Sequence, residues 1–250
     1  MSVISRRQRE KEQRRKDIIM AAEKLFFKRG YDNVSMNDIA KEVELSKATL
    51  YLYFDNKEAL FFLIVMRGVK ILNSMVKNSV DKEEKGIDKL VCFRRAYIDF
   101  VNKYPDYFKI YAYFHSGRFD LESVVNNAYL REFAKGRQYS MVSTIDFLLP
   151  EPTFNEYAVD ILDLDKEIFD ICCDSIKKGI EDGSIQPDVN PVEITVLLLL
   201  LLESTVNMRP DMVKKLETNG INKYEFADDV SDLLGKIIRL KYPNISKDEK

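Results

Sequence analysis

The stretch from Ser35 to Leu60, SMNDIAKEVELSKATLYLYFDNKEAL, constrains the fold of this chain more than any other. Ser35 and Asp38 have the spacing of a capping box, which satisfies the free N–H groups at the start of a helix. An apolar face follows at helical spacing, formed by Ile39, Ala40 and Val43. Residues 44–46 then lead into a second helix, predicted over Lys47–Phe54 and capped by Ser46. Two short helices with so tight a connection predict a helix-turn-helix unit.

The second of these helices has two faces of different chemistry. Leu50 and Phe54 are four residues apart and share one face, which we expect to be buried. The opposite face carries Ala48 and Leu52, flanked by Thr49 and Tyr51, with Lys47 in the first turn. A face that served solubility alone would carry more Glu and Lys. This small, hydroxylated and aromatic face suits entry into a groove of DNA.

Further helices are predicted on both sides of this unit. The preceding helix covers Arg15–Arg29 and ends at Gly30, a residue that readily terminates helices. The following helix begins near Asn56, after a D-x-x-E cap signal at Asp55, and continues to Val80. Residues 1–16 are rich in Arg and Lys, and we expect their first part to be disordered when free. This segment is either an arm that contacts DNA or a solvated tail or helix extension.

A family resemblance rests on seven short motifs in the first quarter of the chain. They are Ile18-x-x-Ala21-Ala22-x-x-Leu25-Phe26, Gly30-Tyr31, Val34-Ser35-Met36, Asp38-Ile39-Ala40, Ser46-Lys47-Ala48-Thr49-Leu50-Tyr51, Tyr53-Phe54 and Lys57-Glu58-Ala59-Leu60. In this order they resemble the DNA-binding domain of the TetR/AcrR family of repressors. The resemblance implies an all-α fold. It also implies a basic arm and helix-turn-helix domain over residues 1–55, and a larger helical effector-binding and dimerisation domain over residues 56–250.

The resemblance also implies which residues contact DNA. Lys47 and Tyr51 would reach bases or phosphates, whereas Ser35, Tyr53 and Lys57 would hold phosphates at the rims of the groove. Relatives often have an aromatic or polar residue where this chain has Leu52, and we expect Leu52 to contact a thymine methyl group. The full predicted set is Ser35, Ser46, Lys47, Ala48, Thr49, Tyr51, Leu52, Tyr53 and Lys57.

The remainder of the chain predicts more helices and no sheet. They cover Ile87–Tyr104, Pro105–Phe114, Leu121–Leu149, Asp165–Asp182, Asn190–Arg209, Asp211–Thr218 and Tyr224–Lys241. The run of leucines from 197 to 202 is far shorter than the roughly 18 residues that cross a bilayer, so we expect no membrane span and a helix buried on every side. By resemblance, Asp165–Asp182 and Asn190–Arg209 pair with a second copy as a four-helix homodimer interface.

Aromatic side chains concentrate between Phe93 and Phe119. They form either ordinary core packing or a mostly apolar effector pocket, in which tyrosine hydroxyls and the single histidine orient the ligand. Relatives usually place their ligand in this region. The predicted ligand-binding residues are Tyr97, Tyr104, Phe108, Tyr111, Phe114 and His115.

Enzymatic function has little support in the residues. A single histidine excludes multi-histidine metal sites, and the phosphate-binding and dinucleotide-binding glycine motifs do not occur. We therefore expect no catalytic residue, metal or cofactor. Cys92, Cys172 and Cys173 are expected to be reduced, although a redox role for the adjacent pair stays open. The charged N-terminus predicts no signal peptide and hence a cytoplasmic protein.

Charge supports nucleic-acid binding to a modest degree. Residues 1–60 hold 13 Lys and Arg against 10 Asp and Glu, although the whole chain has a net charge of −2. The leading hypothesis is a ligand-responsive regulator, a repressor by resemblance, that binds a palindromic operator as a homodimer. One alternative is a helical protein that binds or modifies a small molecule and whose helix-turn-helix is only structural. Another is a helical adaptor that has lost its DNA contacts.

Overall fold

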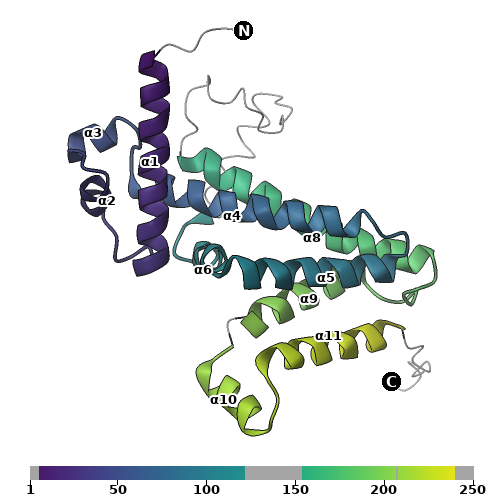
Figure 1. Ribbon diagram of the computed structural model, residues 1–250. Helices are drawn as coiled ribbons and strands as arrows, with labels where there is room; N and C mark the ends of the chain where they lie inside the picture. The colour runs from purple at the N-terminus through teal and green to yellow at the C-terminus, as the bar shows by residue number, and fades with distance from the viewer. Residues whose placement is uncertain (1–5, 122–153, 207, 240–250) are drawn as a thin grey trace. The chain divides into compact units, whose positions relative to one another are not determined.

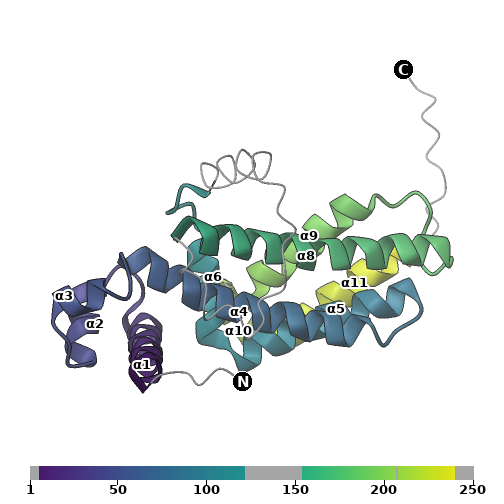
Figure 2. The same ribbon diagram turned by 90° about the horizontal axis from the view of Figure 1, so that it is seen from above.

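The computed structural model describes residues 6–121, 154–206 and 208–239. Every regular element in these ranges is an α-helix, which confirms the predicted all-α fold (Figures 1 and 2). The helices are α1 (Arg6–Arg29), α2 (Met36–Glu42), α3 (Lys47–Tyr51), α4 (Lys57–Val80), α5 (Gly86–Lys103), α6 (Pro105–Phe114), α8 (Phe154–Glu181), α9 (Pro191–Val206), α10 (Pro210–Thr218) and α11 (Lys223–Arg239). The helix predicted over Leu121–Leu149 lies outside the described residues, apart from Leu121.

The chain divides into two compact units, and the first comprises the described parts of residues 1–71 and 104–165. Here α1 packs against α2, and α2 packs against α3. The buried side chains of this small domain include Ile18, Ala22, Leu25, Phe26, Ile39, Leu50, Phe54 and Leu60. Phe26 also meets Phe61 of α4 edge to face, with ring centroids 5.6 Å apart. This packing fixes α3 at the surface of the unit.

Both helices of the helix-turn-helix begin at the predicted caps. The Ser35 hydroxyl oxygen accepts a hydrogen bond from the Asp38 N–H at 3.2 Å, and the Asp38 carboxylate accepts one from the Ser35 N–H at 2.9 Å. Ser46 accepts a hydrogen bond from the Thr49 N–H at 3.0 Å. Between the helices, Glu44 has a φ of 55°. This left-handed conformation reverses the chain within a very short connection.

The second helix is shorter than predicted. α3 ends at Tyr51 rather than at Phe54, because the N–H groups of Leu52 and Tyr53 bond to carbonyls three residues back instead of four. Such bonds tighten the last turn of a helix. The predicted orientation is nevertheless correct, since Leu50 and Phe54 are buried and Leu52 is exposed.

The first helix is longer than predicted, starting at Arg6 instead of Arg15. The segment is rich in Arg, Lys, Glu and Gln, all of which have high helix propensity. Side chains four residues apart also pair along it, with 2.8 Å between Arg6 Nε and Glu10 Oε1. The basic segment from Arg6 onward is thus helical, so the expectation of disorder is wrong for its described residues, and its contact with DNA stays a prediction.

α4 begins one residue later than predicted and has a different cap. Asn56, not Asp55, caps it, because Asn56 Oδ1 accepts a hydrogen bond from the Ala59 N–H at 2.7 Å. Its length and composition would suffice to cross a membrane, but 72% of its apolar window is buried inside the structure. Residues 59–66 are buried consecutively, so this part of α4 is packed on every side, as in a core helix. It contributes residues to both compact units, and the predicted domain boundary after residue 55 stays a prediction.

The second unit comprises the described parts of residues 72–103 and 166–250. The start of α5 packs directly on the backbone of α8, since a Cβ atom at Gly86 would lie 1.9 Å from the backbone nitrogen of Gly179. The turn after α8 caps α5 from a distance in sequence. The Gly86 N–H donates to Asp182 at 2.8 Å, and the Ile87 N–H donates to the Ser184 hydroxyl at 3.2 Å. These bonds satisfy two of the free N–H groups at the start of α5.

α8 begins at Phe154, well before the predicted start at Asp165. Buried Tyr157, Ala158 and Ile161 continue the apolar stripe of the predicted helix upstream at helical spacing, which accounts for the longer helix. α10 and α11 lie within two residues of their predictions at every described end.

α9 begins after Asn190, whose side-chain oxygen accepts a hydrogen bond from the Val192 N–H at 3.0 Å as predicted. The expectation that this helix is buried on every side is wrong for the single chain. Leu198 and Leu202 are buried, whereas Val196 and Leu200 are exposed by 43% and 56%. One side of α9 therefore presents an apolar surface to solvent.

Candidate nucleic-acid interface

The side chains predicted to read DNA lie on the exposed side of α3. Leu52 is 79% exposed and Tyr51 is 42% exposed, whereas Leu50, which points into the core, is 0% exposed. Lys47 and Ala48 are exposed at the start of the helix, and the Lys47 ammonium lies 5.8 Å from the centroid of the Tyr51 ring. The structure thus brings a cation, an aromatic ring and a leucine side chain together on one exposed surface of α3.

Three hydroxyl-bearing residues of the predicted set have structural bonds of their own. Ser46 and Thr49 share a hydrogen bond between their hydroxyl groups at 2.8 Å, and Ser35 is bonded to Asp38 through both its N–H and its hydroxyl. These bonds with Ser35, together with Arg29 and Lys41 nearby, hold the pKa of Asp38 below its usual value. Tyr53 lies half-buried in the turn after α3. These side chains therefore have a structural role, because their hydrogen bonds fix the position of α3. Contact of the same side chains with DNA would be a second role, and it stays a prediction.

Lys57 is less free than the sequence suggested. Its ammonium donates a hydrogen bond to the Tyr31 carbonyl at 3.1 Å and lies 3.9 Å from the centroid of the Tyr31 ring. The Tyr31 hydroxyl in turn donates to Glu58 at 2.5 Å. Burial, followed by this bond to Glu58, raises the pKa of Tyr31 above its ordinary value. Lys57 keeps further N–H donors for a phosphate, and that contact stays a prediction.

A polar junction connects α1 with α4 and α6 inside the first unit. Glu23 accepts a hydrogen bond from Arg67 of α4 at 3.0 Å and another from the Tyr107 hydroxyl of α6 at 3.0 Å. The Tyr107 ring also packs edge to face on Phe27, with centroids 5.1 Å apart, and leaves no room for a Cβ atom at Gly68. Burial, followed by the charge of Glu23, raises the pKa of Tyr107 to about 12. Sequence reasoning missed this junction, because its members lie far apart along the chain.

The predicted ligand-binding residues are distributed over both units. Tyr97 is buried in α5 of the second unit, and the others belong to the first. Tyr104 precedes α6, and Phe108 and Phe114 are buried in that helix. Tyr111 and His115 converge on Asp165: the Tyr111 hydroxyl donates to it at 3.0 Å, and His115 Nε2 lies 2.9 Å from its other oxygen.

Asp165 was not among the predicted site residues, and no local pattern pointed to it. The Tyr111, His115 and Asp165 side chains form a polar edge beside buried aromatic rings, with the Phe114 and His115 rings 5.0 Å apart. Such an edge could orient a polar group of an otherwise apolar ligand. That role stays a prediction.

The cysteines and acidic residues give no sign of a reactive centre in the described parts of the chain. No three His, Cys, Asp or Glu residues gather there in a way that could hold a metal ion. Cys172 is buried, and burial raises the pKa of its thiol to about 12, which disfavours the reactive thiolate. All three cysteines are free thiols.

A short helix held at the surface by a cap, with one side buried and the other exposed, defines a helix-turn-helix protein of the DNA-binding class. Comparison with known proteins is more specific. Residues 18–64 match the family of bacterial regulatory proteins known as the tetR family. The chain is 36% identical over 81 residues to IcaR of Staphylococcus aureus, a negative transcriptional regulator of the biofilm operon icaADBC. This match covers 32% of the present chain and 44% of that regulator.

Solved structures extend the likeness of the fold over most of the chain. A regulatory protein of the tetR family from Rhodococcus RHA1 covers 92% of this chain and 98% of its own, with a TM-score of 0.60 and 15% identity. AibR, solved with isovaleryl coenzyme A and operator DNA, covers 91% of this chain and all of its own, with a TM-score of 0.58 and 20% identity. Residues 18–64 are therefore similar to the helix-turn-helix domain of the tetR family, and the fold of the remaining described residues is similar to that of solved regulators of this family.

Proposed function

We propose that this chain is a transcriptional regulator that binds duplex DNA through α3 and acts as a repressor. The observation that carries the proposal is the exposure of Leu52, Tyr51 and Lys47 on a helix whose opposite side is buried. A reading helix needs such a surface to place side chains on base edges in the major groove. The similarity to IcaR, a negative regulator, supports repression. The proposed role includes no catalytic step and places the protein in the cytoplasm.

The test of this role is a reporter assay. Genomic fragments from the source organism that the immobilised chain retains would be placed upstream of a reporter gene. Expression of the chain should lower transcription from the retained fragments and leave unretained fragments unaffected. Raised transcription would identify an activator instead. Binding of small molecules without retention of any fragment would favour the alternative, a ligand-binding protein whose helix-turn-helix is only structural.

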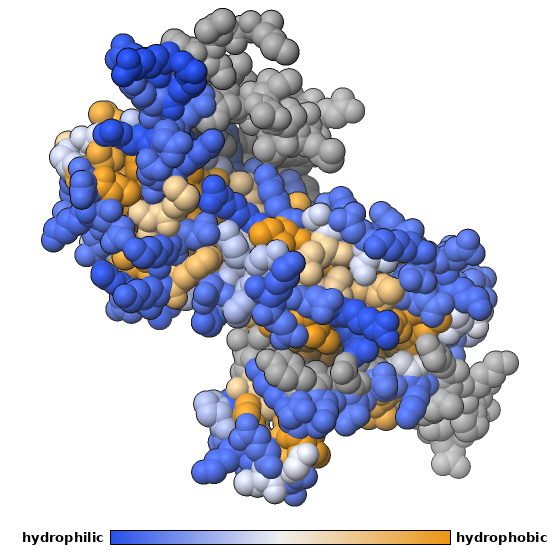
Figure 3. Space-filling view, viewed as in Figure 1, coloured by the Kyte–Doolittle hydropathy of each residue, from blue (hydrophilic) through white to orange (hydrophobic). Residues whose placement is uncertain are grey.

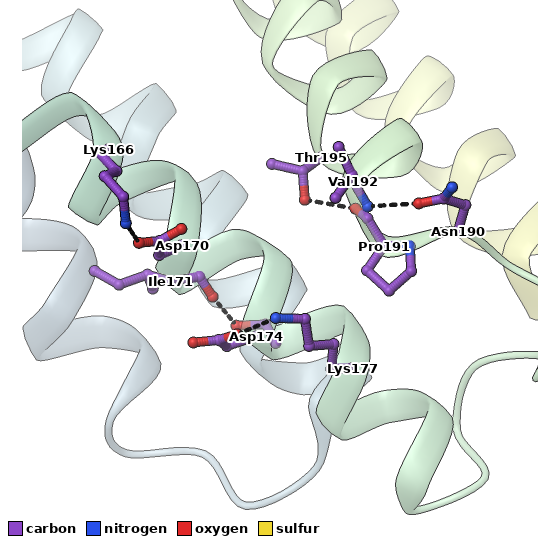
Figure 4. Close-up of polar contacts among 10 residues, drawn as sticks. Lys166, Asp170, Ile171, Asp174, Lys177, Asn190, Pro191, Val192 and Thr195 are labelled. Atoms are coloured by element: carbon purple, nitrogen blue, oxygen red, sulfur yellow. Dashed lines mark hydrogen bonds and ion pairs between the residues drawn. The ribbon is translucent and has the colours of Figure 1, made fainter. Parts of the chain in front are cut away.

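We further propose that the protein binds DNA as a homodimer formed through α8 and α9. The exposed apolar side chains Val192, Val196, Leu197 and Leu200 lie within about 140° on α9 at 100° per residue. Beside them, the outer side of α8 is charged and internally paired, with Lys166 bonded to Asp170 and Lys177 to Asp174 (Figure 4). An apolar strip with a charged border is the usual composition of a protein interface.

Substitution of one residue on each of two helices tests the homodimer. Leu200→Arg should produce monomers, because it places an unpaired charge in the centre of the apolar strip. Leu233→Arg on α11 is the matched control, since Leu233 is 57% exposed but lies outside α9. Sedimentation should show a dimer for the wild type and for the control. A monomeric wild type at micromolar concentration would contradict the homodimer and with it the palindromic operator.

The effector is proposed to be a mostly apolar small molecule that binds among the aromatic residues predicted above. Acyl thioesters of coenzyme A are the first candidates to test, since AibR was solved with one. Binding would change the spacing of the two α3 helices, which must lie about 34–36 Å apart to enter successive major grooves. The α1–α4–α6 junction at Glu23 is a route for this change, because α4 continues from the first unit into the second.

Thermodynamic linkage supplies the test of effector control. If ligand weakens DNA binding by some factor, DNA must weaken ligand binding by the same factor. Isovaleryl coenzyme A and longer acyl thioesters would be titrated into the protein with and without the retained duplex. Reciprocal loss of affinity is expected for the effector, whereas equal affinities with and without DNA would exclude this mechanism for that ligand.

A further inference from the structure

The N-terminal part of α1 extends past the helix-turn-helix as a basic helix. Residues 6–16 precede the first buried residue of α1, Ile18, and the helix rises about 1.5 Å per residue, so Arg6 lies about 18 Å beyond Ile18. α3 lies beside the N-terminal half of α1 (Figure 1). The projecting end of α1 is a strongly hydrophilic surface (Figure 3). The N-terminal segment of α1 therefore extends beyond the rest of the domain on the side where α3 lies.

The basic residues of this extension are not distributed evenly around the helix. At 100° per residue, Arg7, Lys11 and Arg14 lie within about 60° of one another. The same side, about one and three turns after Arg14, is occupied by Ile18 and Leu25, which are buried in the helix-turn-helix core. The three cations thus continue the side of α1 that packs on the helix-turn-helix domain. All three are exposed, and none has an ion pair with a residue in the described ranges.

One arginine fixes the base of this extension against the end of the reading segment. The Arg15 guanidinium lies 5.1 Å from the centroid of the Phe54 ring, three residues after Tyr51 closes α3. Arg15 also donates a hydrogen bond to the Tyr157 hydroxyl at 3.2 Å. These contacts hold the root of the extension in a set position relative to α3. The direction of its charged side is therefore determined by the fold.

We propose that Arg7, Lys11 and Arg14 form a phosphate-binding strip that contacts the DNA backbone next to the base pairs read by α3. The proposal rests on the DNA-binding role proposed above and adds a second contact surface to it. Phosphate is the partner because the strip is cationic and, within its described residues, has no apolar side chain. A helix with its side chains is about 10–12 Å wide. It cannot enter a minor groove of about 6 Å, so the strip binds phosphates along the groove edge.

The contact has a defined effect on binding. Each phosphate contact to B-DNA contributes about 0.9 to the slope of log affinity against log salt, without regard to sequence. Removing two contacts per protomer from a dimer should lower that slope by about 3.6. Between 50 and 200 mM salt, the strip variant should therefore lose about 150-fold less affinity than the wild type loses. The preferred base sequence should not change, because phosphates carry no sequence information directly.

Two double variants of equal charge test the strip. Arg7→Gln with Lys11→Gln removes two cations from the strip. Arg9→Gln with Lys16→Gln removes two from the opposite side of α1, which further along carries Glu23 and Phe27 and packs on α6. Both variants have the same net charge and the same substitution types. Circular dichroism would verify that each keeps the helical content of the wild type.

The variants would be titrated with the duplex selected by the wild type, carrying about one helical turn, or 10 base pairs, of flanking DNA on each side. The strip variant should show the reduced salt slope, and the control should keep the wild-type slope. With the flanks trimmed away, all three proteins should bind alike. Equal slopes for the two variants on the long duplex would overturn the phosphate strip and leave the DNA-binding role intact. A wild type that selects no duplex would instead overturn the role on which the strip rests.

Discussion

Leu50 and Leu52 stand two residues apart and should respond in opposite ways to the same substitution. Leu52 is 79% exposed and Leu50 is 0% exposed. Truncation of a fully buried leucine to alanine costs about 2–5 kcal/mol of stability, so Leu50→Ala should lower the free energy of unfolding by that amount. Leu52→Ala should leave it within about 0.5 kcal/mol of the wild type, because an exposed side chain loses few contacts.

DNA binding should show the reverse dependence for Leu52. Complete burial of a leucine side chain is worth about 1.5–3 kcal/mol, and a thymine methyl group covers only part of it. We therefore expect Leu52→Ala to weaken each half-site by about 1 kcal/mol, roughly fivefold in affinity, and to relax the preference at one A·T pair. The salt slope should be nearly unchanged, since no charge is removed.

Urea unfolding and DNA titration, performed on both variants, decide between the possibilities. An unchanged operator affinity for Leu52→Ala would show that this side chain is idle and that the reading surface is elsewhere. A large loss of stability for Leu52→Ala would show that the side chain is buried and that the orientation of α3 is wrong.

Three further predictions concern the two compact units. Gly86→Ala should cost several kcal/mol or prevent folding, because its Cβ would overlap the Gly179 backbone, whereas Gly235→Ala should stabilise α11 by up to about 1 kcal/mol in urea unfolding. The hydrogen bonds that Asp182 accepts from Ser184 and Gly86 lower the pKa of its carboxyl group. The stability that this group contributes is present above its unfolded pKa of about 3.9 and is lost as the pH falls through its lower folded pKa. Asp182→Asn should therefore reduce the dependence of the unfolding free energy on acid pH. Tyr107→Phe should lower the free energy of unfolding by about 1–3 kcal/mol, because a half-buried carboxylate loses one donor, and an unchanged urea midpoint would contradict the junction.

The helix-turn-helix could be predicted because its signals are local. The capping box at Ser35 and Asp38 and the cap at Ser46 each span four residues, and the buried pair Leu50 and Phe54 spans one helical turn. The positions at which helices begin and end were harder to predict. Asn56 and Asp55 are adjacent and equally suited to capping α4, and only the structure shows that Asn56 accepts the hydrogen bond of the cap.

Features that depend on distant residues could not be predicted. Asp165 lies 50 residues from His115, and nothing in its neighbourhood indicates the contact. The exposure of Val196 and Leu200 could not be distinguished from burial, because the leucine run is apolar on every side of α9 and only the packing of Leu198 and Leu202 reveals which side is free. The direction of the basic strip on α1 likewise required the position of α3.

Selection of bound sequences from random duplex DNA tests the central claim most directly. If α3 reads bases from a homodimer, the wild-type chain should enrich an inverted repeat whose half-site centres are about 10 base pairs, or 34–36 Å, apart. The Leu52→Ala variant should enrich the same repeat with one relaxed A·T position. Failure of the wild type to enrich any sequence above the starting pool would contradict the account.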